Sequence, residues 1–216
     1  MASDVDICNM ALSHFGSESV VTSLSPVDGS VEAGHCKRFF SLARKEALEM
    51  APFTWTKKRA LMAAVTNPSS TWAYAYALPG DCLSPLRVLQ QAKASEWLFG
   101  PSSSALTADA LRIFTERGSA DFELEGQVLL THEPEAVLLY TRDITDLTHY
   151  SAAFISGFSY LLASYLAGPL IKGREGAAAG RELRAAARDA LAAAAVQDAN
   201  SSSEGSEFMP ASLQVR

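Results

Sequence analysis

The feature that most constrains this chain of 216 residues is a run of twenty residues, Ala152 to Ile171, that carries no charged side chain. Such a run is long enough for a helix that crosses a bilayer, so a single membrane span is one alternative. Three serines, two glycines and Pro169 interrupt the run, and no Lys or Arg bias flanks its start. We therefore expect a buried helix at the centre of a helical bundle, packed closely against its neighbours through its small residues.

Two helices are predicted in the N-terminal part, residues 1–62. Ser3 is a suitable N-cap for the first helix, in which apolar side chains recur at helical spacing. A second helix is expected from about Ser30 to Ala51, and Pro52 ends it. Its inner face carries Cys36, Phe40, Ala43, Ala47 and Met50, and its outer face carries Lys37, Arg38, Arg44, Lys45 and Glu49. We interpret the charged face as solvated, with a partner-binding face as the alternative.

A change of period marks a strand-rich insert over residues 72–142. Large and small side chains alternate from Trp72 to Leu78, which predicts a strand with its bulky side chains on one face. We interpret these aromatic residues as core rather than as a base-stacking platform, because the strand has no flanking Lys or Arg. Further short strands are expected at 87–91, 95–99, 111–115, 122–124, 127–131 and 136–142, a spacing typical of a small antiparallel sheet or barrel.

Helix is predicted again over residues 146–199. Beyond Pro169, an Ala-rich helix from Ala177 to Ala199 has a narrow apolar seam that includes Leu183 and Leu191. A seam made mostly of methyl groups buries little apolar area, so this helix needs a neighbour.

Residues 200–216 have the composition of a polar, disordered tail with a few spaced apolar residues, among them Phe208, Met209 and Leu213. The predicted fold class is therefore α+β. A helical bundle is built from the N- and C-terminal segments, and a small antiparallel β-sheet or barrel is inserted between them.

Composition and motifs argue against several classes of function. The formal net charge is −6, whereas a protein that holds duplex DNA by its phosphates usually has a basic stripe. Cys8, Cys36 and Cys82 lack C-x-x-C spacing, and the N-terminus lacks the features of a signal peptide, which indicates free thiols in a reducing compartment. Nucleophile elbows, Walker loops and metal-binding histidine spacings do not occur. We expect no enzyme activity, no cofactor and no metal.

Several segments carry a resemblance to a known family. They are Asp6–Leu12 with Phe15-Gly16, Cys36 through Arg44, Pro52–Trp55 leading to Arg59-Ala60-Leu61, Tyr74–Leu83, Leu139-Tyr140 before Asp143, and the helix from Phe154 to Ala167. In this order they resemble the tail tubular protein A family, the adaptor proteins of short-tailed bacteriophages. One departure is that Ser84-Pro85 precede Arg87 where the family usually has an earlier arginine, so we expect the following strand to begin late.

The resemblance implies a structural virion protein. Identical subunits, typically twelve, would form a ring between the portal vertex and the tail nozzle protein, and DNA would pass through the lumen without sequence-specific binding. Such a protein is made in the host cytoplasm, ends in the neck of the virion and contacts no membrane.

Two sets of residues are candidate protein interfaces under this interpretation. Phe208, Met209 and Leu213 would anchor the tail on the portal. A neighbouring subunit would cover the seam of Leu183 and Leu191. A single-span membrane protein and a tail-associated, wall-degrading hydrolase are the alternative functions.

Overall fold

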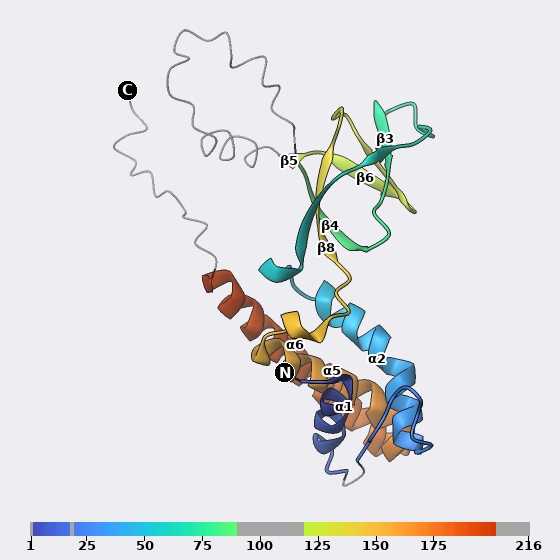
Figure 1. Ribbon diagram of the computed structural model, residues 1–216, viewed down its shortest axis with the longest axis vertical. Helices are drawn as coiled ribbons and strands as arrows, with labels where there is room; N and C mark the ends of the chain where they lie inside the picture. The colour runs from blue at the N-terminus through green and yellow to red at the C-terminus, as the bar shows by residue number, and fades with distance from the viewer. Residues whose placement is uncertain (1, 18–19, 90–118, 202–216) are drawn as a thin grey trace, which may run out of the picture.

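The computed structural model describes residues 2–17, 20–89 and 119–201. In this part of the chain, four α-helices form a helical body at one end and short strands form a β module at the other (Figure 1). The helices come from both ends of the sequence and the strands from its middle. The predicted α+β class, with an antiparallel module inserted into a helical bundle, is confirmed.

Capping residues set the start of the first two helices. In α1 (Asp4–Ser13), the Ser3 hydroxyl accepts a hydrogen bond from the Asp6 N–H, and the Asp6 carboxylate accepts one from the Ser3 N–H at 2.8 Å. This reciprocal capping box satisfies two backbone donors that the first turn leaves without partners. Ser30 caps α2 (Val31–Glu49) through the N–H of Ala33.

The uncharged run forms α5 (Ala152–Ile171), the central helix of the helical body. It packs against α1, α2 and α6 (Gly173–Ser201). By length and composition α5 is also the one helix among the described residues that could cross a membrane, and 50% of its most apolar stretch is buried inside the molecule. Five of its large apolar side chains are fully buried in the helical body: Phe154, Phe158, Leu161, Leu162 and Leu166.

α6 lies along α5 over a seam of small residues. Ala187, Leu191 and Ala194 are buried in this seam. A Cβ atom on Gly157 of α5 would lie 2.7 Å from Cγ of Leu191, so the helices approach as closely as they do because this position is glycine. The narrow Ala-rich seam therefore has its partner within the same chain.

The β module consists of two small antiparallel sheets. One has the strand order β1 (Lys57–Leu61), β8 (Val137–Arg142), β4 (Cys82–Leu89) and β5 (Ser119–Ala120). The other has the order β2 (Ala63–Ala64), β3 (Tyr74–Ala77), β7 (Val128–Thr131) and β6 (Phe122–Glu125).

The two sheets share one apolar core and two corners. The chain passes from one sheet to the other through a single residue at Met62, between β1 and β2, and at Asp121, between β5 and β6. Longer connections cross between the sheets from β3 to β4 and from β7 to β8. The core is formed by residues of both sheets and their connections: Met62, Tyr76, Val88, Leu129, Ala136, Leu138 and Tyr140. Tyr76 is thus core as predicted, whereas Tyr74 on the same strand is 42% exposed.

The β module begins earlier than the predicted residue 72. β1 pairs with β8, with Lys57 opposite Thr141, so the end of the predicted N-terminal helical part belongs to a sheet. The expectation of a late strand after Ser84-Pro85 is also wrong, because β4 begins at Cys82 and absorbs these residues in two register shifts. The strands predicted at 95–99 and 111–115 lie outside the described residues.

Candidate interaction surfaces

A buried ion pair joins the helical body to the β module. Nη2 of Arg44, on α2, donates to both carboxylate oxygens of Asp143 at 2.8 and 3.0 Å. Asp143 directly follows β8, so the pair connects the last strand to the second helix. The Arg44 side chain is only 10% exposed, which contradicts its predicted place on the solvated face of α2. Arg44 lies three residues before Ala47 and four before Leu48, both buried, so it is on the inner side of α2. Asp143 supplies the carboxylate that a buried guanidinium needs.

A second polar cluster holds the base of the β module. Nζ of Lys58 donates to Asp81 at 2.8 Å, and the Tyr140 hydroxyl donates to the other oxygen of that carboxylate at 2.7 Å. The Lys58 ammonium lowers the pKa of the Asp81 carboxyl, and the same bond raises the pKa of Lys58. The Asp81 carbonyl also accepts from the N–H of Asp143 at 2.8 Å. This cluster therefore connects directly to the joint formed by Arg44 and Asp143.

The far end of α6 holds the point where the chain enters the β module. The Asp198 carboxylate accepts from the Thr54 hydroxyl at 2.8 Å and from the Thr54 N–H at 2.5 Å. Thr54 begins the short 3-10 helix η1 (Thr54–Thr56), which leads directly into β1. The chain passes between the helical body and the β module twice, and each passage is held by a side-chain contact. Asp198 binds Thr54 at the first passage, and Arg44 binds Asp143 at the second.

A further polar cluster lies within the helical body, where Glu46 of α2 accepts hydrogen bonds from Tyr165 of α5 and from Arg184 of α6.

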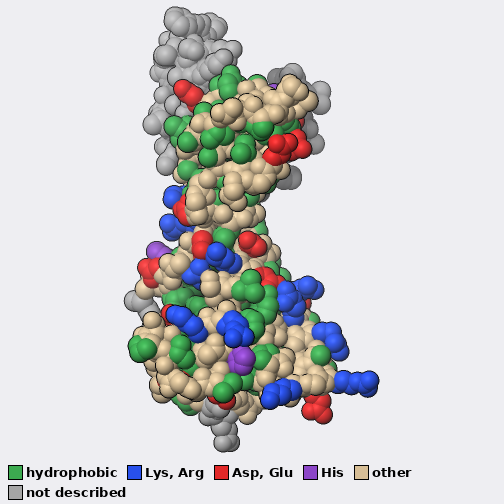
Figure 2. Space-filling model, turned by 90° about the vertical axis from the view of Figure 1, so that its right-hand side faces the viewer, with side chains coloured by type: hydrophobic (Ala, Val, Ile, Leu, Met, Phe, Trp, Pro, Cys, Tyr) green, Lys and Arg blue, Asp and Glu red, His purple; other side chains and the backbone are tan. Residues whose placement is uncertain are grey.

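The outer face of α2, defined by Val31, Arg38, Leu42 and Lys45, mixes apolar and basic side chains, and the exposed Glu49 continues the same line one turn beyond Lys45. Val31 is 66% exposed and Leu42 is 52% exposed. Arg38 and Lys45 lie seven residues apart, so they share one line along the helix. Nζ of Lys45 is 3.9 Å from an Asp143 oxygen, but Arg44 already binds that carboxylate. Figure 2 views the molecule from the side that carries α2 in Figure 1, and Lys and Arg side chains gather there on the helical body.

The outer face of α6, defined by Glu182, Ala185, Asp189, Ala192 and Val196, is acidic. Each of these side chains is exposed, because the opposite side of the helix packs on α5. Glu182 and Asp189 form no ion pair within the described residues. Alanine occupies the positions three and four residues from each of them, so neither has an ion-pair partner at i±3 or i±4 on α6, and the exposed Arg181 and Arg188 precede them on the adjacent side of the helix.

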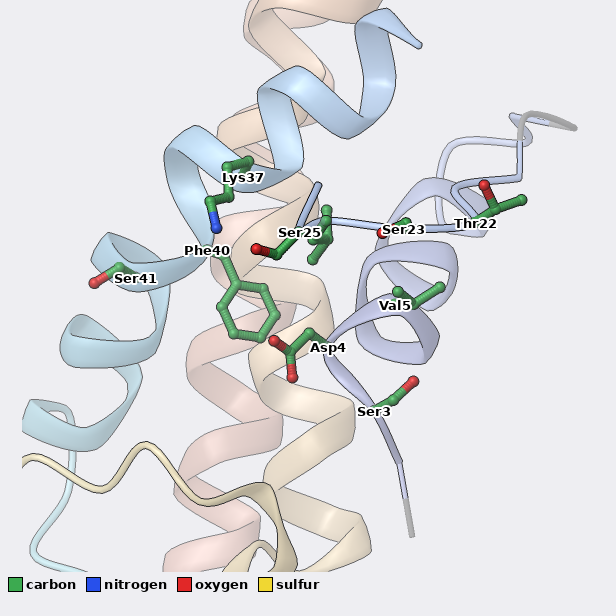
Figure 3. Close-up of a pocket in the computed structure, with 10 residues that line it drawn as sticks. Ser3, Asp4, Val5, Thr22, Ser23, Ser25, Lys37, Phe40 and Ser41 are labelled. Carbon is green, nitrogen blue, oxygen red and sulfur yellow. The ribbon is translucent and has the colours of Figure 1, made fainter. Parts of the chain in front are cut away.

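A pocket of about 400 Å³ lies between the start of α1, the loop that follows α1, and α2. In Figure 3 the Phe40 ring points into it beneath Lys37, and Asp4 faces it from α1. With one carboxylate, one ammonium and no histidine or cysteine, this pocket lacks a nucleophile with its base and a pair of carboxylates. Its walls are Ser3, Asp4, Val5, Thr22, Ser23, Leu24, Ser25, Lys37, Phe40 and Ser41.

The cysteines are free thiols, as their spacing predicts. Cys8 of α1 and Cys36 of α2 are both 0% exposed. A hydrogen bond between these two thiols raises the pKa of Cys8 and lowers the pKa of Cys36, and burial raises the pKa of Cys82 to about 11. In the part of the chain that the structure describes, no group of three His, Cys, Asp or Glu could hold a metal ion.

The structure separates the predicted interface residues. Leu191 is 1% exposed and packs on Gly157, so it is not available to a neighbouring subunit, and the prediction that a subunit covers it is wrong. Leu183 is partly buried against the same core. Phe208, Met209 and Leu213 lie outside the described residues. The outer faces of α2 and α6 were not predicted as a pair, although the seven-residue spacing of their charges is visible in the sequence.

Comparison with known protein families and curated proteins found no match. No protein-family model matches the chain, and no curated protein matches it at a significant level.

Proposed function

We propose that this chain is the subunit of an adaptor ring that joins the portal vertex of a bacteriophage head to the tail nozzle. The observation that carries the proposal is the joint between Arg44 and Asp143, which fixes the β module on the helical body as one elongated unit (Figure 1). A connecting subunit must present two unlike ends to two unlike neighbours, and it must keep them at a fixed separation. The resemblance of the ordered segments to tail tubular protein A supports the same function.

A ring of identical subunits requires two unlike lateral faces on each subunit, because the contact between neighbours is heterologous. The basic outer face of α2 and the acidic outer face of α6 meet this requirement. A copy number of twelve rests on the resemblance alone. The net charge of −6 suits a channel through which DNA passes without being held by its phosphates.

The two alternative functions have less support. For a membrane span, the large apolar side chains of α5 would have to face lipid, but Phe154, Phe158, Leu161, Leu162 and Leu166 are fully buried inside the molecule. For a wall-degrading hydrolase, the pocket beside Phe40 offers neither a nucleophile with its base nor two carboxylates. We therefore propose a structural role in the virion neck after synthesis in the host cytoplasm, with no catalytic activity and no cofactor.

Light scattering on the purified protein, alone and mixed with portal particles, tests this function. We expect the portal peak to gain mass in a fixed ratio of this chain to portal subunit, and the product to bind nozzle protein afterwards. A protein that leaves the portal mass unchanged would contradict the proposal. Partition into detergent would then favour the membrane protein, and turnover of peptidoglycan would favour the hydrolase.

A further inference from the structure

We infer that the outer face of α2 in one copy of this chain packs against the outer face of α6 in the next copy. In this contact Arg38 lies opposite Glu182, and Lys45 lies opposite Asp189. This contact would be the lateral contact of the ring, and in that respect the inference rests on the proposed function. The charges and spacings from which it is argued do not depend on the portal or the nozzle.

The spacing of the charges matches on the two helices. Arg38 and Lys45 are seven residues apart on α2, as Glu182 and Asp189 are on α6, and seven residues of helix rise about 10.5 Å. Figure 1 shows both helices running in the same sense, from the far end of the helical body toward the β module. Neighbours in a large ring differ by a small rotation, so the two helices stay nearly parallel and one register joins both charge pairs.

The same register also fits the side chains between the charges. It brings Leu42, which projects from α2, level with Ala185 and Ala186 on α6. A large apolar side chain opposite two small ones lets the helices approach closely and covers a leucine that is 52% exposed in the single chain. The charges then set the register and the leucine supplies the buried area.

Charge also selects a heterologous contact over a symmetric one. Two α2 faces in contact would oppose Arg38 and Lys45 with their own copies, and two α6 faces would oppose Glu182 and Asp189. Both arrangements place like charges together, which disfavours them. Within one molecule both faces are exposed, so they are not each other's partners. A second copy satisfies both faces at once.

Two charge-reversed variants test the contact through the mass of the protein in solution. The first is Arg38→Glu with Lys45→Glu, and the second is Glu182→Lys with Asp189→Lys. All four residues are exposed, so each variant should keep the circular dichroism spectrum of the wild type. Asp121→Lys with Glu125→Lys, exposed on and beside β6, is the matched control.

We expect the wild type and the control to gain mass as concentration rises, and each reversed variant alone to stay monomeric. An equimolar mixture of the two reversed variants should recover the association, because each offers the face that the other needs. A wild type that stays monomeric at every concentration, or a mixture that does not recover, overturns the inference. Portal binding is scored separately, so the adaptor function can survive the loss of this contact, and this contact can survive the loss of the adaptor function.

Discussion

Leu191 of α6 occupies the space that a side chain on Gly157 of α5 would need. The ideal Cβ position at Gly157 is 2.7 Å from the leucine Cγ, 2.8 Å from its Cδ2 and 3.1 Å from its backbone nitrogen. Rotating the leucine side chain could relieve the first two contacts, but only a shift of α6 relieves the third. The distance between these two helices therefore depends on Gly157. It also depends on Gly176 and Gly180 of α6, where a Cβ atom would lie 2.8 Å from the Ala167 carbonyl oxygen and 3.2 Å from the Ser164 carbonyl oxygen.

Replacing Gly157 by alanine should destabilise the helical body. Overpacking costs ~1–3 kcal/mol, and the better helix propensity of alanine recovers roughly 1 kcal/mol, so we expect a net loss of up to about 2 kcal/mol. Urea unfolding followed by circular dichroism measures it. Gly34→Ala, at an exposed position in α2, is the control, because nothing lies within 4 Å of its added methyl group. That variant should gain up to about 1 kcal/mol, and equal effects of the two variants would contradict this explanation.

Removing the guanidinium of Arg44 should weaken the joint between the two parts of the molecule. An Arg44→Leu variant leaves the carboxylate of Asp143, 22% exposed, without its main partner, and breaking a largely buried pair costs about 3 kcal/mol or more. Lys45→Ala, on an exposed side chain beside the same carboxylate, should cost less than about 1 kcal/mol. Urea midpoints distinguish the two, and a midpoint of Arg44→Leu equal to that of Lys45→Ala would show that the joint contributes little.

His14 should make the fold less stable below neutral pH. Its Nε2 atom lies 2.8 Å from the Ser159 hydroxyl, its ring stacks on Tyr160, and burial lowers its pKa from 6.5. The unfolded chain takes up this proton first as the pH falls. Stability is therefore complete above about pH 6.5, decreases below it, and levels off beneath the folded pKa. Melting temperatures between pH 7.5 and 5 should show this decrease in the wild type and a smaller one in His14→Gln, whereas His149→Gln, at an exposed position, should keep it.

Deleting residues 202–216 should abolish portal binding and leave the fold intact. The cut falls after the last residue of α6, so Asp198 and its bonds to Thr54 remain. The hypothesis is that Phe208, Met209 and Leu213 anchor the chain on the portal. Unfolding should be unchanged, and co-sedimentation with portal particles should be lost. Retained binding would exclude the tail as the anchor, and a lysine in place of each of the three residues should mimic the deletion.

Local signals predicted the helices and their places in the bundle. The capping pair of Ser3 and Asp6 and the uncharged run of α5 depend only on residues a few positions apart, and both have the predicted role. The strand at Tyr74–Ala77 was visible for the same reason, because its alternation needs no partner to be recognised.

Features that depend on distant residues were missed. Lys57 to Arg59 show no alternation of polar and apolar side chains, and they form a strand because β8 pairs with them. Arg44 was assigned to the solvated face because it is charged, although it lies four residues after Phe40 and three before Ala47, and its partner Asp143 is distant in the sequence. Leu191 was predicted to contact a neighbouring subunit, but it packs on Gly157 of the same chain. Because glycine has no side chain, nothing in the sequence indicated this contact.

The helices of the helical body come from both ends of the chain, so they are synthesised at different times. α1 and α2 leave the ribosome first, but the helix that covers their apolar sides begins only at Ala152. At about 5–20 residues per second, the first two helices wait roughly 5–20 s for α5. The outer face of α2 exists during that interval, whereas α6 is still to be made. A nascent chain can therefore offer only the α2 half of the proposed contact to a completed copy, and it can offer both halves only after α6 has been made.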